Sequence, residues 1–348
     1  MVLVHHGFYL LTPNTKLAAV ASVGFVGVGF FFVLSGFVLT WSHNPDLPVR
    51  YFYGRRLARI YPLHLVTAVL ALGLALALGQ GVEPGQALLN LLLLQSWVPV
   101  ESFGSSLNGV SWSLCCEAFF YLMFPALGRW ARRWDLSAAI WVVAGVLVMV
   151  AVTAVILLPH DAAQQFLYKG PAYRTGGFIL GIILALQIKG GRRLKVSVKF
   201  AVVFACFSYC LALAASLVAT RVGLPDLRVY GDLITLPAAY VLIAAATRSD
   251  LNGEAGLLRH PRLVVLGEAS FALYMTHYLL LTAWVGFVGV PGSMAVGVAV
   301  FVGLSLVSVV ISVAAYRWIE HPAERYFRAR IGTPPATAHR DRVAAAER

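Results

Sequence analysis

Apolar segments long enough, or nearly long enough, to cross a lipid bilayer recur along this chain from end to end. A membrane-spanning helix needs about 20 apolar residues, and only helices or closed barrels satisfy their backbone groups inside lipid. The runs lie at 24–41, 62–79, 111–128, 137–158, 175–188, 199–220, 232–247, 267–289 and 293–316, and a shorter run occupies 1–11. The sequence therefore predicts an all-α, polytopic membrane bundle of about ten transmembrane helices.

The remaining segments are short. Residues 86–100 are apolar but fit no full crossing, and we expect a re-entrant or interfacial piece there. The polar segment 321–348 is too short to enclose a core of its own. We therefore expect a transmembrane domain over 1–320, followed by a cytoplasmic polar tail.

The chain is strongly basic, with 27 Lys and Arg against 15 Asp and Glu. A basic excess can indicate nucleic-acid binding, but the positions of these charges indicate membrane topology instead. If residues 42–61 are cytoplasmic and each later helix crosses once, 22 of the 27 cations fall on the inner side. This pattern follows the positive-inside rule. It predicts a multi-pass protein of the plasma membrane with both termini in the cytoplasm and no nucleic-acid partner.

The stretch "SWSLCCEAFFYLMFPAL" places an ionisable carboxylate, Glu117, inside an apolar helix. A charged group within the membrane costs several kcal/mol unless it faces a partner or a polar cavity, so it is a candidate functional residue. Ser113, Glu117 and Tyr121 share one helix face because they are four residues apart. The alternative is a buried glutamate that only ties helices together.

An imidazole is the partner that we expect for this carboxylate. Under the topology above, His5 lies below the outer end of its helix by as many residues as Glu117 lies below the start of its own. At 1.5 Å per residue, both groups are roughly 9 Å deep. Two separate helices would thus bring a base and a carboxylate to one level. A thiol nucleophile, Cys115 or Cys116, is an alternative that we keep open, although small apolar packing is the better explanation of these helical cysteines.

Three further groups have both functional and structural interpretations. Ser35 follows a stretch whose small residues Gly24, Gly27 and Gly29 would allow close helix packing, but a membrane serine often bonds only its own i−4 carbonyl. Arg55, Arg56 and Arg59 could grip phosphates, or they could anchor the chain to lipid head groups. His277 lies near the middle of a late helix, where a neutral histidine bonded to a carbonyl is the structural alternative.

Six stretches together resemble the acyltransferase 3 family of integral membrane O-acyltransferases. They follow the family's order and cover nearly the whole chain: "VHHGF" near the start, "VGFFFVLSGFVL" at 28–39, "RRLARIYPLH" at 55–64, "WSLCCEAFFYLMFP" at 112–125, "LGEASFALYMTHYLLL" at 266–281 and "YRWIEHPAERYF" at 316–327. The resemblance implies a bundle of membrane helices. It also implies transfer of an acyl group, from an acyl-CoA donor such as acetyl-CoA, to a hydroxyl group.

The resemblance also implies roles for individual residues. The family's first-helix histidine corresponds to His5, with His6 as the alternative, and its late-helix histidine corresponds to His277. Its Trp-Ser-Leu-x-x-Glu motif falls on Trp112, Ser113, Leu114 and Glu117, its Phe-Phe-x-x-Ser-Gly motif on Phe31, Phe32, Ser35 and Gly36, and its arginine motif on Arg55, Arg56 and Arg59. Ala118 stands where a second glutamate is common. Members usually carry an arginine before the first histidine, and we expect a longer start or a substitute arginine here.

These residues define a mechanistic hypothesis. His5 takes the proton of an acceptor hydroxyl as its oxygen attacks the thioester, and Glu117 orients the imidazole, as the acidic member of a hydrolase triad does. Arg55, Arg56, Arg59 and Ser35 would bind the donor. The acceptor would contact Trp112, Ser113, Tyr121 and His277, and it would be a sugar, a macrolide-type natural product or a surface glycan. No metal is needed. The alternative is a transporter in which Glu117 and His277 relay protons.

Overall fold

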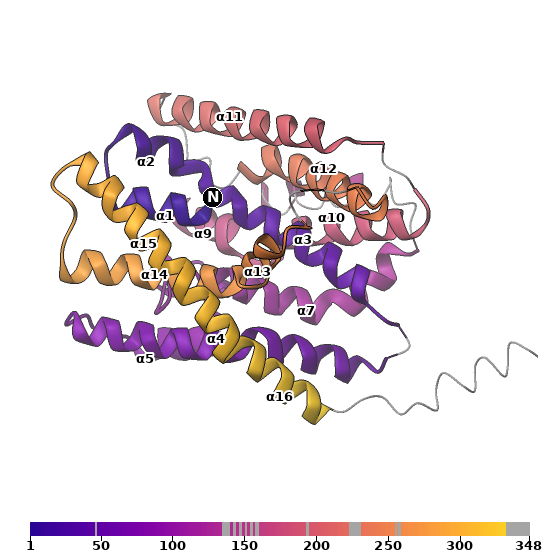
Figure 1. Cartoon of the computed structure of the whole chain (residues 1–348), viewed down its shortest axis with the longest axis horizontal. Helices are drawn as coiled ribbons and strands as arrows, with labels where there is room; N and C mark the ends of the chain where they lie inside the picture. The colour runs from indigo at the N-terminus through magenta and orange to yellow at the C-terminus, as the bar shows by residue number, and fades with distance from the viewer. Residues whose placement is uncertain are drawn as a thin grey trace, which may run out of the picture.

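The chain folds into a bundle of helices in every part that the structure describes (Figure 1). The computed structural model describes residues 1–45, 47–133, 160–192, 195–222, 231–254, 256 and 259–331, with isolated positions between 140 and 156. Most of its helices are α1 (Val2–Leu11), α2 (Lys16–Ala21), α3 (Val26–Ser42), α4 (Val49–Ala77), α7 (Trp112–Ala131), α9 (His160–Lys169), α10 (Pro171–Lys189), α11 (Val198–Val222), α12 (Gly231–Leu251), α13 (Pro261–Glu268), α14 (Ser270–Phe287), α15 (Met294–Ala315) and α16 (His321–Ile331). No strand occurs among these residues, so the predicted all-α class is confirmed.

Fewer helices qualify as membrane spans than the sequence predicts. In the described residues, five stretches are long and apolar enough to cross a bilayer: Lys16–Ser42, Val49–Ala77, His160–Lys189, Val198–Ala219 and Met294–Ile331. The pair α13 and α14, bent by 62° at its break, can add a sixth.

The expected number of about ten spanning helices is therefore not confirmed. Helix α7 forms where it was predicted but carries Glu117 and Arg129, and α1 has only ten residues. The apolar run at 137–158 lies largely outside the described residues.

The segment before α7 is a set of short helices anchored by buried amides. It contains α5 (Pro84–Leu91), η2 (Gln95–Trp97) and α6 (Glu101–Gly104), none long enough to span a bilayer. The Asn90 amide donates to the Ser106 carbonyl at 2.7 Å and to the Ser111 hydroxyl at 3.0 Å. The Gln95 amide donates to the Ser111 carbonyl at 3.1 Å. These bonds fix the start of α7 and thereby the position of Glu117.

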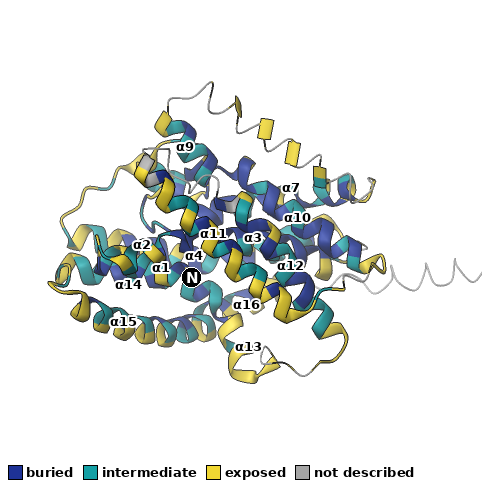
Figure 2. Cartoon of the chain, turned by 90° about the horizontal axis from the view of Figure 1, so that it is seen from above, coloured by how far each residue is buried: buried dark blue, intermediate teal, exposed yellow. Residues whose placement is uncertain are grey.

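Helices α3 and α10 touch at the backbone in the centre of the bundle. A Cβ atom added to Gly36 would lie 2.0 Å from the Phe178 carbonyl oxygen, and one added to Gly181 would lie 2.0 Å from the Val33 carbonyl oxygen. Phe178 also stacks on Phe120 of α7, with ring centroids 4.8 Å apart. Figure 2 shows that buried residues are concentrated along α3, α7 and α10. These three helices form the core that carries one wall of the candidate site.

Apolar side chains cover much of the outer surface. On α15, Leu306 and Val310 are among the large exposed side chains, and on α11 Val203 and Phe207 are exposed as well. In water such a surface would promote aggregation, whereas in lipid it meets acyl chains. The distribution fits a protein whose outer helices face the bilayer.

The chain continues past α15 without leaving the bundle. A short π-helical segment, η5 (Tyr316–Glu320), joins α15 to α16, which packs against α4. A Cβ atom added to Gly54 would come within 2.7 Å of the Ile331 side chain. The first part of the segment that we assigned to a polar tail, 321–331, thus forms a packed helix, and residues 332–348 lie outside the described part of the chain.

Candidate active site

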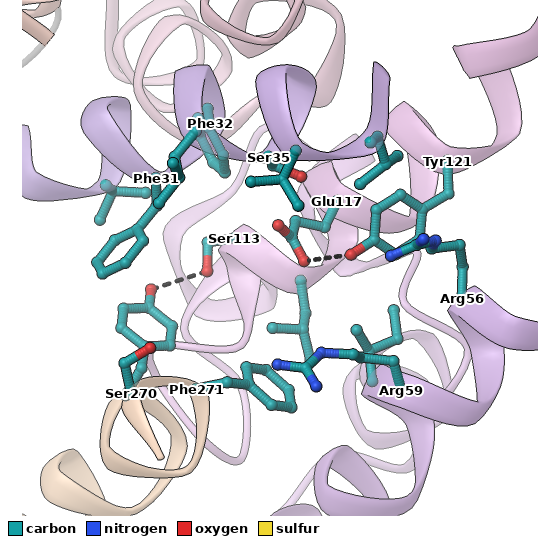
Figure 3. A pocket seen from close by; sticks show the side chains of 17 residues that line it. Phe31, Phe32, Ser35, Arg56, Arg59, Ser113, Glu117, Tyr121, Ser270 and Phe271 are labelled. Carbon is teal, nitrogen blue, oxygen red and sulfur yellow. Dashed lines mark hydrogen bonds between the residues drawn. The ribbon is translucent and has the colours of Figure 1, made fainter. Parts of the chain in front are cut away.

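A cavity of about 220 Å³ lies where α3, α4, α7 and α14 meet (Figure 3). Its wall is formed by Val28, Phe31, Phe32, Leu34, Ser35, Val38 and Leu39 of α3, Arg56, Arg59 and Ile60 of α4, Ser113, Leu114, Glu117 and Tyr121 of α7, and Ser270, Phe271 and Tyr274 of α14. Six of the candidate catalytic and binding residues therefore share one cavity: Ser35, Arg56, Arg59, Ser113, Glu117 and Tyr121. The motif residues Phe31, Phe32 and Leu114 line it as well. Apolar walls around a few charged and polar groups are typical of small-molecule sites.

The polar face of α7 lines this cavity as its spacing predicts. The Tyr121 hydroxyl donates to the Glu117 carboxylate at 2.9 Å, one helical turn away. The Ser113 hydroxyl bonds the Tyr274 hydroxyl of α14 at 2.8 Å, and the Tyr274 hydroxyl donates to the Val110 carbonyl at 3.0 Å. In Figure 3 the Glu117 carboxylate points into the cavity between Ser35 and Tyr121. The predicted shared face of Ser113, Glu117 and Tyr121 is confirmed.

Two of the three motif arginines reach the cavity, and they differ in their partners. Arg59 forms ion pairs with Glu320 at 3.4 Å and with Glu324 at 3.3 Å. Arg56 forms no ion pair with a carboxylate in the described part of the chain. Arg55 does not line the cavity. Among the described residues, Arg56 thus lines the cavity together with Glu117 but without a direct ion pair.

Sequence reasoning missed the carboxylates that hold Arg59. The Glu320 side chain is 0% exposed and belongs to η5, and Glu324, on α16, also pairs with Arg328. The stretch "YRWIEHPAERYF" drew attention to this region, but nothing in its local pattern points to an arginine more than 250 residues earlier in the chain. Two buried carboxylates are tolerated here because two guanidinium groups lie against them.

Cations from α4, from α10 and from the end of α7 lie around the loop that follows α3. Burial and then the nearby cations Arg132, Lys189 and Arg56 lower the pKa of His43, which lies between α3 and α4. The Lys189 ammonium also donates to the Thr40 carbonyl at 3.0 Å. Burial is the larger cause of this lowered pKa, and the additional lowering by three cations indicates a locally positive potential, which favours anionic ligands.

The histidines lie beside the cavity and not in its wall. The His5 ring nitrogen Nδ1 bonds the Ala21 carbonyl at 2.9 Å, whereas the Glu117 carboxylate accepts from Tyr121. The His5 ring and the Glu117 carboxylate therefore have different hydrogen-bond partners in these two bonds. The catalytic pairing of His5 with Glu117 stays a prediction. His6 and His277 instead bond each other, with Nδ1 of His6 3.0 Å from Nε2 of His277.

Three other residues that the sequence suggested as functional, Trp112, Cys115 and Cys116, are packed in the protein interior and do not line the cavity. Trp112 packs edge-on against Phe32 and lies beneath the Arg174 guanidinium, outside the cavity wall. Cys115 and Cys116 are free and 0% exposed. Such buried thiols are inert, so a thiol nucleophile gains no support. Among the described residues, no group of three or more His, Cys, Asp or Glu side chains could hold a metal ion.

Comparison with known proteins identifies the class. The family model described as an acyltransferase domain matches residues 1–317, and the chain therefore belongs to the acyltransferase 3 family. Family membership and the O-acetyltransferases among its relatives identify the protein as an O-acyltransferase. Its long apolar helices fit a membrane protein.

Several relatives are similar over most of the chain. Acyltransferase MdmB of Streptomyces mycarofaciens is 34% identical over 284 residues, which cover 77% of this chain and 71% of that protein. Exopolysaccharide production protein ExoZ of Rhizobium meliloti is 31% identical, with 89% and 92% covered. O-acetyltransferase OatA of Staphylococcus aureus is 24% identical over 87% of this chain, which spans about half of that protein (53%). No solved structure gives a significant match.

Proposed function

We propose that this protein transfers an acyl group from acyl-CoA to a hydroxyl group of a sugar, a macrolide-type natural product or a surface glycan at the plasma membrane. The observation that carries the proposal is the cavity in which Glu117 and two arginines meet inside an apolar bundle. Relatives named as an exopolysaccharide production protein and as a peptidoglycan O-acetyltransferase support a hydroxylated glycan as one class of acceptor.

The cations fit a phosphate-bearing donor. Arg56 lines the cavity without a carboxylate partner among the described residues, and Arg132 and Lys189 lie close enough to His43 to lower its pKa, after burial. A guanidinium binds phosphate through paired N–H groups. The donor's phosphates would lie at these cations on the cytoplasmic side, and its pantetheine arm would carry the thioester between the helices.

The reaction then moves one proton from the acceptor hydroxyl to the departing sulfur, in two transfers. An imidazole of α1 takes the proton of the acceptor hydroxyl as its oxygen attacks the thioester carbonyl. The carbon–sulfur bond breaks, and the proton is returned to the departing sulfur, which leaves as the CoA thiol. Glu117 accepts a hydrogen bond from one of the bound reactants in the cavity, and such a bond to a carboxylate is strong.

The proposal is tested with the purified protein in nanodiscs, radiolabelled acetyl-CoA and a panel of acceptors. We expect release of free CoA thiol that depends on the acceptor, together with a labelled ester product identified by mass spectrometry. If no acceptor releases CoA thiol, and acceptor molecules instead cross the membrane of proteoliposomes unmodified, the transporter alternative is favoured and acyl transfer is rejected.

The three motif arginines should respond differently to alanine. Arg56→Ala removes the cavity cation that pairs with no carboxylate of the described residues, so the KM for acyl-CoA should rise by about tenfold or more, which is the loss of one charged hydrogen bond. Arg59→Ala should also lower the Tm in detergent, because Glu320 is left buried without its cation. Arg55→Ala should have the smallest effect on KM. Equal KM increases for Arg55→Ala and Arg56→Ala would show that the donor does not bind at the cavity.

A further inference from the structure

A second cavity, of about 440 Å³, lies between the ends of α10 and α12, two helices that pack against each other (Figure 1). None of the residues in its wall lines the candidate active site. The wall is formed by Ile188, Gly191, Arg192 and Lys195 at and after the end of α10, and by Ala244, Arg248, Leu251 and Asn252 at and after the end of α12. This cavity is therefore separate from the site of acyl transfer proposed above.

The wall of this cavity is positively charged. Among its described residues, Arg192, Lys195 and Arg248 are cations and none is acidic. Arg192 and Lys195 form no ion pair with a carboxylate in the described ranges of the chain. Arg248 pairs with Glu254 at 3.5 Å, but the two side chains are 41% and 46% exposed, so water screens this pair and weakens it. The cavity thus favours a ligand that carries negative charge.

The backbone fixes where these cations lie. Gly191 has a φ of +85°, the left-handed conformation in which a helix ends with a Schellman motif. The Arg192 N–H donates to the Gln187 carbonyl at 3.0 Å, as that motif requires. From the other side, the Arg248 guanidinium donates to the Val196 carbonyl at 3.1 Å and ties the segment after α10 to α12. The two helix ends and the segment between them therefore hold the cavity in one shape.

Apolar groups complete the wall and place the cavity at the edge of the membrane. Ile188 and Ala244 come from facing helices, and Leu251 is 60% exposed. The candidate membrane span His160–Lys189 ends at this cavity. The positive-inside rule predicts that the cations at these helix ends face the cytoplasm. A cavity that combines apolar groups with cations at this level fits a ligand that has both acyl chains and a phosphate.

We propose that this cavity binds the phosphate head group of an anionic phospholipid of the inner leaflet. A guanidinium binds phosphate oxygens through paired N–H groups, and a lysine adds a compact positive charge. Basic pockets between the cytoplasmic ends of membrane helices typically bind such head groups. The glycerol end of the lipid lies against apolar side chains of the wall, such as Leu251. This binding does not depend on acyl transfer, so it can be tested whether or not the proposed function holds.

Native mass spectrometry of the purified protein in detergent measures the binding. The parent protein should retain phosphatidylglycerol much better than phosphatidylcholine with the same acyl chains. The double variant Arg192→Gln/Lys195→Gln should bind phosphatidylglycerol about 25-fold more weakly, since each basic side chain near anionic head groups contributes about fivefold. The matched control Arg133→Gln/Arg262→Gln removes two exposed cations that the same topology places in the cytoplasm but that do not line the cavity. It should keep the parental affinity.

Three results would overturn the proposal. Equal losses in the two double variants would show that the overall surface charge holds the lipid, and the cavity would be rejected as its site. Equal retention of phosphatidylglycerol and phosphatidylcholine would show that the negative charge of the lipid is not recognised. If CoA or inorganic phosphate displaced phosphatidylglycerol from the parent protein at constant ionic strength, the cavity would be a site for soluble phosphates and the assignment to a lipid would be wrong.

A photoreactive phosphatidylglycerol tests the site in the parent protein and does not depend on the folding of any variant. Crosslinks should map to residues 188–195 and 244–252, and an excess of unlabelled phosphatidylglycerol should suppress them. Crosslinks that map to other segments would contradict the proposal. Phosphatidylglycerol should also raise the Tm of the parent protein in detergent more than that of Arg192→Gln/Lys195→Gln, because a ligand that binds only the folded state stabilises it. An equal rise in both proteins would reject the cavity as the site.

Discussion

Glu117→Gln is expected to lower kcat/KM for acyl transfer by about 10²-fold while leaving the protein folded. Glutamine has the same shape and can still accept the hydrogen bond from Tyr121, but it removes the negative charge from a cavity that also contains Arg56 and Arg59. A carboxylate in a water-poor site holds hydrogen-bond donors far more strongly than an amide does. The measurement is the rate of CoA thiol release at several donor and acceptor concentrations.

The neighbouring tyrosine provides the matched control for Glu117. Tyr121→Phe removes the hydrogen bond to the carboxylate but keeps the charge, and we expect a loss of about tenfold, the usual contribution of a charged hydrogen bond. If Tyr121→Phe were as damaging as Glu117→Gln, the charge would not be the functional feature of this site. If Glu117→Gln kept the parental rate, the cavity would not be where the reactants bind.

The face of α7 could be predicted because it depends only on local geometry. Side chains four residues apart share a helix face, and a carboxylate within an apolar helix must turn that face toward a polar cavity or a partner. Ser113, Glu117 and Tyr121 do line one cavity. The all-helical class could be predicted for a similar reason, since lipid leaves the backbone no alternative to internal hydrogen bonds.

The relation between His5 and Glu117 could not be predicted in the same way. Equal depth along two helices does not fix the rotation of either helix about its own axis, and that rotation decides which side chains meet. In α1 the adjacent residues His5 and His6 point to different neighbours, the Ala21 carbonyl and His277. The ion pair of Arg59 with Glu320 could not be predicted either, because it joins α4 to a π-helical segment. The wider turn of a π-helix changes which side chains of the following helix face inward.

Gly36→Ala and Gly181→Ala are expected to destabilise the core strongly. Each added Cβ atom would lie 2.0 Å from a backbone carbonyl oxygen of the facing helix, so that α3 and α10 would have to separate. Overpacking that forces backbone shifts typically costs about 1–3 kcal/mol, and these two sites should lie at the upper end of that range because the facing atom belongs to the backbone. Because Phe32 and Ser35 of α3 line the cavity, acyl transfer should fall together with the Tm in detergent.

Two other glycines serve as controls, because replacing them by alanine tests the general effect of a helical Gly→Ala substitution without overpacking. Gly73 on α4 and Gly303 on α15 have no atom within 4 Å of an added Cβ. Their replacement by alanine should raise stability by roughly 0.4–1 kcal/mol, because alanine restricts the unfolded chain and favours the helix. The two pairs should therefore shift the Tm in opposite directions. If Gly36→Ala and Gly181→Ala left the Tm unchanged, the close approach of α3 and α10 would not hold the cavity together, and the position of Ser35 opposite Glu117 would need another cause.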